Sequence, residues 1–371
     1  MSEAKPPKYN DKRPLPPGHK RCPKINYHGR RIYMVTLCVE GRHRLLGTLT
    51  GDSAETAAIE PSALGRRVLQ CWENIPAIQR QLAQKKTETS GEPCHRDISL
   101  IACQLMPDHF HGIIFVRGEM DISLGDVVRG FMMGCTKAYR EQNALQNNLE
   151  NKQKPLWEKG FHDRVLSHTG QLNNMISYVR DNPRRLWLKT HNPDLFRLHR
   201  QTEVRGLVFT SLGNHFLLDW PDRQLVEMSR SASEKQIEER LQLVLTAARN
   251  GAVTYTAAIS QGEKLIARAL REQSFSLVVL LSDGFPAEES PEARYYKPGG
   301  LYFEACSQGR LLLLEPSEQT LHLPSVSEAT NLTLRTKAEA RHSCSSDIPA
   351  SLQRYRFMAL NAIGRMLVED R

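Results

Sequence analysis

The sequence predicts two consecutive domains, an α+β domain built on an antiparallel sheet and then a smaller α/β domain. In the first half, β-branched runs alternate with amphipathic segments, and two of these runs are separated only by a turn. In the second half, helical segments alternate with wholly apolar runs, as buried parallel strands do. Charge divides in the same way, because residues 1–200 carry a net +11 and the remainder −2. A positive field on the first domain alone indicates a polyanionic partner, with nucleic acid as the leading candidate.

Composition excludes several classes of protein. With 371 residues the chain is long enough for two hydrophobic cores, and 40% of it is hydrophobic, as in ordinary soluble proteins. It has no run of about 18 apolar residues to span a membrane and no apolar signal-peptide segment. Its eight cysteines form no Cys-x-x-Cys pair, which favours a reduced, cytoplasmic setting over a disulfide framework or a zinc knuckle.

Residues 1–28 are rich in proline, lysine and arginine, and they predict an extended basic arm that includes Arg21. Such an arm can lie along phosphates, although its first dozen residues equally suit a disordered tail.

The first domain, residues 29–200, is predicted from a regular order of elements. Strands are expected at 31–39, 98–105 and 157–165, with a further strand running from His109 to Val116 after a turn at Pro107 and Asp108. Helices are expected at 61–77, 122–139 and 175–185, the last one ended by Pro183. This order predicts an antiparallel sheet with helices on one face, the ferredoxin-like or RRM-like arrangement.

A linker at 190–205 precedes the second domain, residues 205–325. Helices at 233–249, 261–272 and 299–309 alternate with strands at 214–219, 252–255, 275–282 and 311–314, which predicts a small Rossmann-like parallel domain. Residues 326–371 are expected to form a loose segment followed by a helix at 348–369.

The main candidate site is the His-x-His sequence at the start of the strand expected from His109 to Val116. Residues two apart in a strand point to the same side, so His109 and His111 project together while Phe110 points into a core. Two neighbouring imidazoles provide half of a metal site. Tyr178 and Asn182 are four residues apart on a predicted helix, so a phenol and an amide oxygen share one helical face. A nucleophile, a third ligand and a metal-binding pair are therefore expected around one phosphate.

These residues resemble those of the HUH single-strand DNA endonucleases, and especially their one-tyrosine, REP-associated transposases. The resemblance rests on three blocks in the same order, Met106–Gly112, Trp157–Arg164 and Tyr178–Arg185, and covers roughly residues 30–190.

The resemblance implies an HUH core and a transposase that nicks and rejoins single-stranded or hairpin DNA. Tyr178 would be the nucleophile of a 5′-phosphotyrosine intermediate, and His109, His111 and Asn182 would hold Mg²⁺ or Mn²⁺. The protein would be a monomer or homodimer, cytoplasmic and associated with the nucleoid. The expected DNA contacts are Arg21, Arg30, Arg31, Arg129, Lys137, His162, Arg164, Arg184 and Arg185.

Two other functions remain open from the sequence. A His-x-His metal hydrolase would leave Tyr178 with a structural role, and a domesticated hairpin-binding protein would have lost cleavage. In the second domain, the run Ala258–Glu263 resembles the Rossmann-like module of DprA-type proteins. Its helix start can hold a phosphate, but Ser260 as a plain N-cap is the favoured interpretation.

Overall fold

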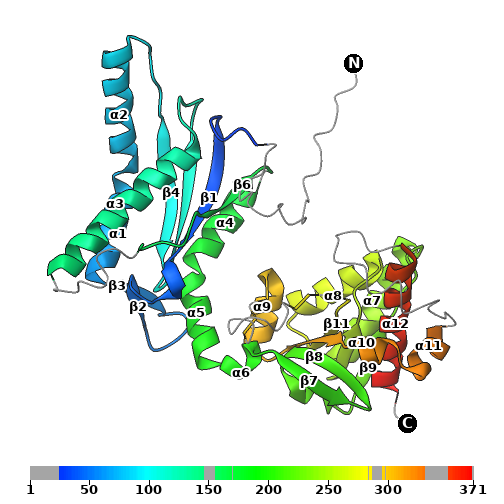
Figure 1. Cartoon of the computed structure of the whole chain (residues 1–371). Helices are drawn as coiled ribbons and strands as arrows, with labels where there is room; N and C mark the ends of the chain where they lie inside the picture. The colour runs from blue at the N-terminus through cyan, green and yellow to red at the C-terminus, as the bar shows by residue number, and fades with distance from the viewer. Residues whose placement is uncertain are drawn as a thin grey trace, which may run out of the picture. The chain divides into compact units, whose positions relative to one another are not determined.

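The computed structural model describes residues 25–145, 155–168, 170–282, 284–285, 295–296, 298–330 and 350–369. The chain divides into two compact units, Met1–Leu188 and Lys189–Arg371 (Figure 1). Most of the predicted basic arm, including Arg21, lies outside the described residues, as do 146–154 and most of the predicted loose segment. None of the helices in the described ranges has the length and apolar character needed to cross a membrane.

The first unit contains an antiparallel sheet of four strands in the order β4-β5-β1-β6. The strands are β1 (Arg31–Cys38), β4 (Ile98–Leu105), β5 (His109–Val116) and β6 (His162–Leu166). Strand β1 lies inside the sheet, since it pairs with both β5 and β6. An α+β domain with an antiparallel sheet is therefore confirmed.

Helices cover both faces of this sheet, and the expectation of one covered face was wrong. On one face α1 (Ala63–Glu73) and α3 (Leu124–Leu145) pack on Tyr33, Val35 and Phe110 in the main core. On the other face α4 (Gln171–Arg180) packs on Ile113 through Met175 and Val179. The reason is visible in the chain, because both faces of β1 and β5 carry apolar residues that must be buried.

Several boundaries in the first unit differ from the prediction. The expected helix 61–77 is two helices that meet at Asn74, and the second, α2 (Ile75–Ser90), extends well beyond residue 77. A small hairpin, β2 (Gly47–Thr50) and β3 (Ala58–Pro61), was not predicted as such. Pro183 does not end a helix: α4 ends at Arg180, and α5 (Asn182–His191) begins with Pro183 in its first turn, where a missing N–H costs nothing.

The second unit has a mixed sheet of six strands in the order β7-β8-β12-β11-β10-β9. Its parallel part contains β9 (Arg223–Val226), β10 (Val253–Thr256), β11 (Leu277–Leu280) and β12 (Leu311–Pro316). An antiparallel hairpin, β7 (His199–Val204) and β8 (Leu207–Gly213), extends it beside β12. The predicted linker 190–205 was wrong, because it holds α6 (Pro193–Phe196) and β7, and the expected strand at 214–219 is a 3-10 turn at His215–Leu218.

The parallel strands follow one another in sequence order, joined by α7 (Glu234–Arg249), α8 (Gln261–Glu272) and α9 (Gly300–Ser307). Right-handed crossovers in one direction place these helices on one face of the sheet. The other face is buried by α12 (Ala350–Val368), together with α10 (Glu318–Leu321) and α11 (Pro324–Thr330). A doubly wound Rossmann sheet reverses its strand order, and the crevice at that reversal binds the nucleotide. The order β9-β10-β11-β12 contains no such reversal.

Candidate functional site

The two histidines follow a turn that is held at three points by backbone hydrogen bonds. The N–H of Met106 donates to the carbonyl of His109 at 2.8 Å and closes the β4–β5 hairpin. From the segment after β1, the N–H of Val39 donates to Asp108 O and that of Leu46 to Pro107 O, both at 2.9 Å. Because Pro107 cannot donate to the ladder, a turn is expected at this point, and the structure confirms it.

Strand register places a row of polar side chains across one face of the sheet. His111 lies opposite Thr36 on β1 and Gln104 on β4, and Thr36 in turn lies opposite His162 on β6. Paired residues point to the same side, so all four belong to the face that carries His109. The apolar half of this face, around Ile113, is the half that α4 covers.

The imidazoles of His109 and His111 lie edge to face, with ring centroids 4.8 Å apart. Each ring is oriented through Nδ1: that of His109 lies 2.6 Å from Asp108 Oδ1, and that of His111 lies 2.8 Å from Thr36 Oγ1. Burial raises the pKa of Asp108, but its hydrogen bond with His109 and the charge of Arg42 outweigh burial and hold this pKa below its usual range. Bonding at Nδ1 makes Nε2 the nitrogen with which each ring would ligate a cation.

Tyr178 is the residue of α4 that reaches this row. Its ring packs edge-on against His111, with centroids 6.0 Å apart, and the guanidinium of Arg185 lies 5.5 Å from its ring centroid. Arg185 and Arg184 both bond to Asp181, with Nε–oxygen distances of 2.5 and 2.6 Å. Burial raises the pKa of Asp181, yet these two bonds prevail and keep it below its usual range. Both arginines lie in the first turn of α5, and Arg185 lies beside the tyrosine ring.

Asn182 is 2% exposed and starts α5 instead of sharing a helix with Tyr178. Its amide nitrogen donates to the carbonyl oxygens of Tyr178 at 2.9 Å and Val179 at 3.3 Å. These bonds cap the end of α4 and fix the orientation of the amide.

In the part of the chain that the structure describes, the site offers a divalent cation two imidazole ligands but no carboxylate or thiolate group placed beside them to complete the set. The described ranges hold no group of three or more His, Cys, Asp and Glu side chains placed to bind a metal ion. A cation on His109 and His111 would therefore complete its shell with other oxygens, such as those of an amide, water or phosphate. Mixed imidazole and oxygen ligands are compatible with manganese, and with magnesium when most ligands are oxygen.

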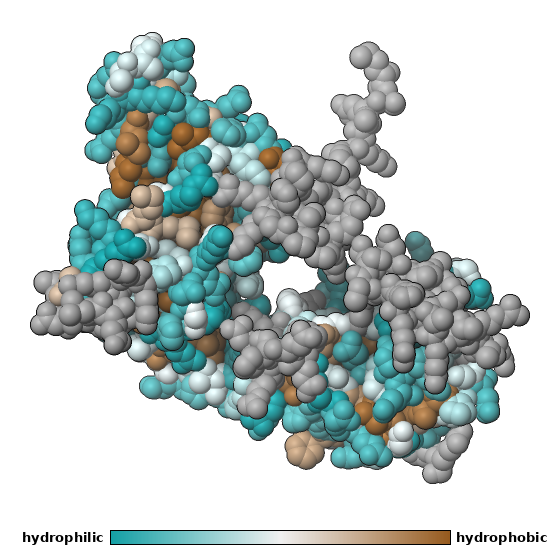
Figure 2. All heavy atoms as spheres, viewed as in Figure 1, coloured by the Kyte–Doolittle hydropathy of each residue, from teal (hydrophilic) through white to brown (hydrophobic). Residues whose placement is uncertain are grey.

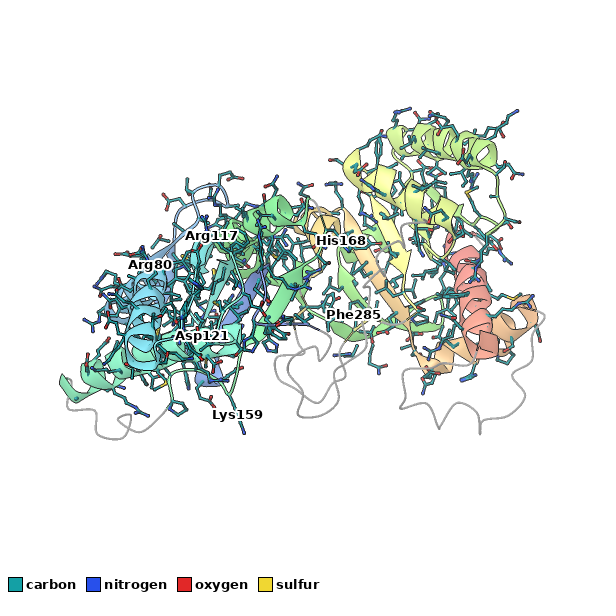
Figure 3. All side chains as sticks on the ribbon, turned by 90° about the horizontal axis from the view of Figure 1, so that it is seen from above. Arg80, Arg117, Asp121, Lys159, His168 and Phe285 are labelled. Atoms are coloured by element: carbon teal, nitrogen blue, oxygen red, sulfur yellow. The ribbon has the colours of Figure 1, made fainter. Side chains whose placement is uncertain are left out.

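The predicted DNA contacts fall on different sides of the first unit. His162 and Arg164 are exposed on the edge strand β6, with their register partners Thr36 and Met34 on the histidine face. Arg30 and Arg31 are exposed before and at the start of β1. Lys159, which precedes β6, points outward in Figure 3 and adds a positive charge close to His162 in the chain.

Arg129 and Lys137 are also exposed, but they belong to α3, which packs on the opposite face of the sheet. Arg129 is paired with Asp126. The same side carries apolar surface around α2, where Ile78 and Leu82 are each 46% exposed (Figure 2). The structure therefore does not bring these two basic residues to the histidines.

Three aromatic residues of the first unit that could have offered rings for base stacking are core residues instead. Tyr33 is 0%, Trp157 4% and Phe161 6% exposed, and all three belong to the main core of the first unit. The residues that sequence reasoning missed are Thr36, Asp108 and Arg42. Of these, only Asp108 could have been suspected from the sequence, because it directly precedes His109. Thr36 reaches His111 through the register of β1 with β5, and Arg42 reaches Asp108 through the turn after β1.

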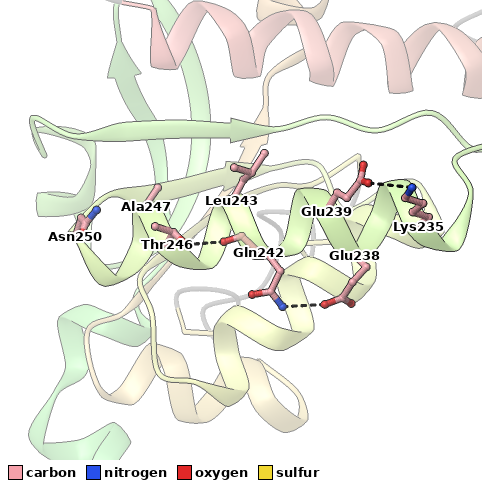
Figure 4. A pocket seen from close by; sticks show the side chains of 8 residues that line it. All are labelled: Lys235, Glu238, Glu239, Gln242, Leu243, Thr246, Ala247 and Asn250. Carbon is pink, nitrogen blue, oxygen red and sulfur yellow. Dashed lines mark hydrogen bonds and ion pairs between the residues drawn. The ribbon is translucent and has the colours of Figure 1, made fainter.

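Two of the pockets in the second unit border helices α7 and α8. One is a groove of about 940 Å³ along the outer face of α7, and its polar side chains pair with one another on that same helix, as Gln242 does with Glu238 (Figure 4). A second, of about 700 Å³, lies beyond the carboxyl ends of β9 and β10 and is lined partly by Ser260 and Glu263. Here the Glu263 carboxylate accepts the N–H groups of Ile259 and Ser260 in a complete capping box. The protein's own carboxylate thus takes the place that a phosphate would need at this helix start.

Comparisons with known proteins give distant matches. No protein-family model matches the chain. An uncharacterized protein of Haemophilus influenzae is 22% identical over 178 residues, which cover 43% of this chain and 83% of that protein. The solved structure of a REP-associated tyrosine transposase bound to a REP hairpin matches 43% of this chain and 70% of its own, with 15% identity and a TM-score of 0.24. A TM-score this low does not establish a common fold, so the function has to be argued from the site itself.

Proposed function

We propose that this protein is a single-strand DNA endonuclease and strand transferase, a transposase, that acts through a covalent bond between Tyr178 and DNA. One observation carries the proposal: the Tyr178 ring lies against His111, and His111 lies against His109, on the face of the sheet against which α4 packs. A phenol beside two imidazoles is an arrangement in which a nucleophile and a cation act on one phosphate.

In the proposed reaction, Tyr178 Oη attacks the scissile phosphorus. The Oη–P bond forms while the P–O3′ bond breaks, the phenol proton is lost, and the departing 3′ oxygen gains a proton as a free hydroxyl. A tyrosine has an unperturbed pKa of about 10, so it needs a positive environment to act as a nucleophile. The Arg185 guanidinium supplies a fixed positive charge next to the ring.

A divalent cation, when bound, would polarise the scissile phosphate and screen its charge. His109 and His111 would hold it through Nε2, with an oxygen ligand such as Asn182. The phosphodiester energy is conserved in the phosphotyrosine bond, so a 3′ hydroxyl can attack it in turn and rejoin strands. Because Tyr178 must reach a phosphate free of a partner strand, single-stranded or hairpin DNA is the proposed substrate, and His162 and Arg164 at the edge of the same face are its proposed contacts.

The test is a denaturing gel of protein incubated with labelled single-stranded hairpin DNA and Mn²⁺. We expect a covalent protein–DNA band with the wild-type chain and none with Tyr178→Phe, which loses only the attacking oxygen. Tyr139→Phe is the matched control, because it removes a phenol oxygen from α3 on the other side of the sheet and should leave the band unchanged. Cleavage without a covalent band would instead support a metal hydrolase, and retarded but intact DNA a hairpin-binding protein.

A further inference from the structure

We propose that Asp108 and Arg42 are positioning residues for His109, and that they set the affinity of the histidine pair for a divalent cation. The inference rests on the proposed function, because it concerns the same site.

The first step is the contact between Asp108 and His109. Asp108 Oδ1 lies 2.6 Å from His109 Nδ1, while Arg42 Nε lies 3.1 Å from the other carboxylate oxygen. A carboxylate at Nδ1 holds the imidazole in the tautomer that presents Nε2 to a cation, and it makes that nitrogen a stronger donor. The carboxylate in turn has one partner on each oxygen, so its plane is fixed.

The second step concerns how Asp108 itself is held. Its carbonyl and that of Pro107 accept hydrogen bonds from the segment that follows β1, at Val39 and Leu46. Those bonds tie the turn before β5 to the end of β1, and they leave the Asp108 side chain little freedom to move away from the His109 ring.

The third step is the backbone at Arg42. Gly41 has φ +62° and Arg42 has φ +56°, so two consecutive residues occupy the left-handed region, which an arginine rarely adopts. The turn is closed by the Arg42 N–H donating to Val39 O at 2.9 Å. This conformation directs the Arg42 side chain back to Asp108. Unfavourable backbone conformations that persist in folded proteins cluster at functional sites.

The two histidines are supported unequally, and this gives the inference its specific prediction. His111 bonds at Nδ1 to the neutral hydroxyl of Thr36, whereas His109 bonds to a carboxylate. A neutral partner orients a ring but adds less to its basicity than a negative one. Loss of Asp108 should therefore weaken cation binding more than loss of the Thr36 hydroxyl.

The experiment titrates the full chain with Mn²⁺ alone and follows the free ion by electron paramagnetic resonance. Asp108→Ala should raise the dissociation constant about 10- to 100-fold, the usual effect of removing such a partner. Asp108→Asn keeps an acceptor without charge and should raise it less, and Thr36→Val should also raise it less. Arg42→Gly should raise it while keeping the fold, because glycine suits a left-handed φ.

The control removes another ion pair of the first unit, Arg67 with Glu141 at 3.4 Å, through Arg67→Ala and Glu141→Gln. Neither change should alter Mn²⁺ binding. If His109→Ala abolishes binding while Asp108→Ala binds as the wild type does, the positioning role is overturned and the metal site stands. If His109→Ala binds Mn²⁺ as tightly as the wild type, the metal site and the positioning role both fail, while the covalent-adduct gel still decides the role of Tyr178.

Discussion

Gly112, the residue directly after His111, provides a sharp test of how the sheet supports the site. An added Cβ there would lie 2.1 Å from Cη2 of Trp72 and 2.5 Å from its Cζ2, well inside contact distance. The Trp72 ring cannot move aside easily, because it packs against Phe110 and Phe131 with centroids 4.9 and 5.6 Å away. Overpacking of a tight core costs about 1–3 kcal/mol. We expect Gly112→Ala to destabilise the first unit by an amount near the upper end of that range.

The assay is urea unfolding of the full chain, followed by tryptophan fluorescence and by hydrogen exchange in β5. Gly130→Ala is the matched control of opposite sign: Gly130 lies within α3, and no atom lies within 4 Å of the added Cβ. That change should stabilise the helix by about 0.8–1 kcal/mol. Trp72→Phe removes the ring atoms that meet the new methyl group, so Gly112→Ala should cost less in that background. A Gly112→Ala variant as stable as the wild type would refute the packing argument.

Three further predictions concern the metal, the DNA surface and pH. His109→Ala and His111→Ala should each abolish cleavage in the gel assay, and excess chelator should abolish it in the wild type; full activity in chelator would remove the cation from the mechanism. The first unit alone, residues 1–188, should bind and cut a labelled hairpin with an affinity that falls steeply as salt rises, while 189–371 binds weakly or not at all, because their net charges are +9 and 0. Tight, salt-sensitive binding by the second fragment alone would reverse this assignment. Burial and the neighbouring His199 hold the pKa of His215 below its usual value, so this histidine takes up a proton in the unfolded chain before it does so in the folded one as pH falls. The stability of the second unit to urea should therefore fall below about pH 6.5. This loss should shrink in a His215→Gln variant.

The sequence predicted those elements best whose periodicity is strong and whose ends carry capping residues. The helix expected at 261–272 is α8 with the same bounds, because Ser260 and Glu263 form a reciprocal cap that sequence alone signals. The hairpin of β7 and β8 was missed for the opposite reason. It turns at Arg205 and Gly206, with φ of +53° and +75°, and an Arg-Gly pair is a weak turn signal compared with Asn-Gly.

The sequence predicted the two histidines of the candidate site but not the side chains that hold them in place. Strand periodicity alone was enough to predict that His109 and His111 share one face of the sheet. It could not predict Thr36, since the residue that meets His111 depends on the register between β1 and β5, and register is set by packing far along the chain. Nor could it predict Arg42, whose approach to Asp108 depends on a left-handed turn at a residue type that seldom forms one.

The segment from α4 to α5 arranges the residues around Tyr178. Val179 and Met175 bury Ile113, and one residue before Val179 the chain brings Tyr178 to His111. Helix α4 ends at Arg180, the Asn182 amide bonds to its last carbonyls, and α5 starts anew. The same break sets Arg185 beside the Tyr178 ring. Pro183, which the sequence suggested as a helix end, thus lies in the first turn of the helix that carries Arg185 to the Tyr178 ring.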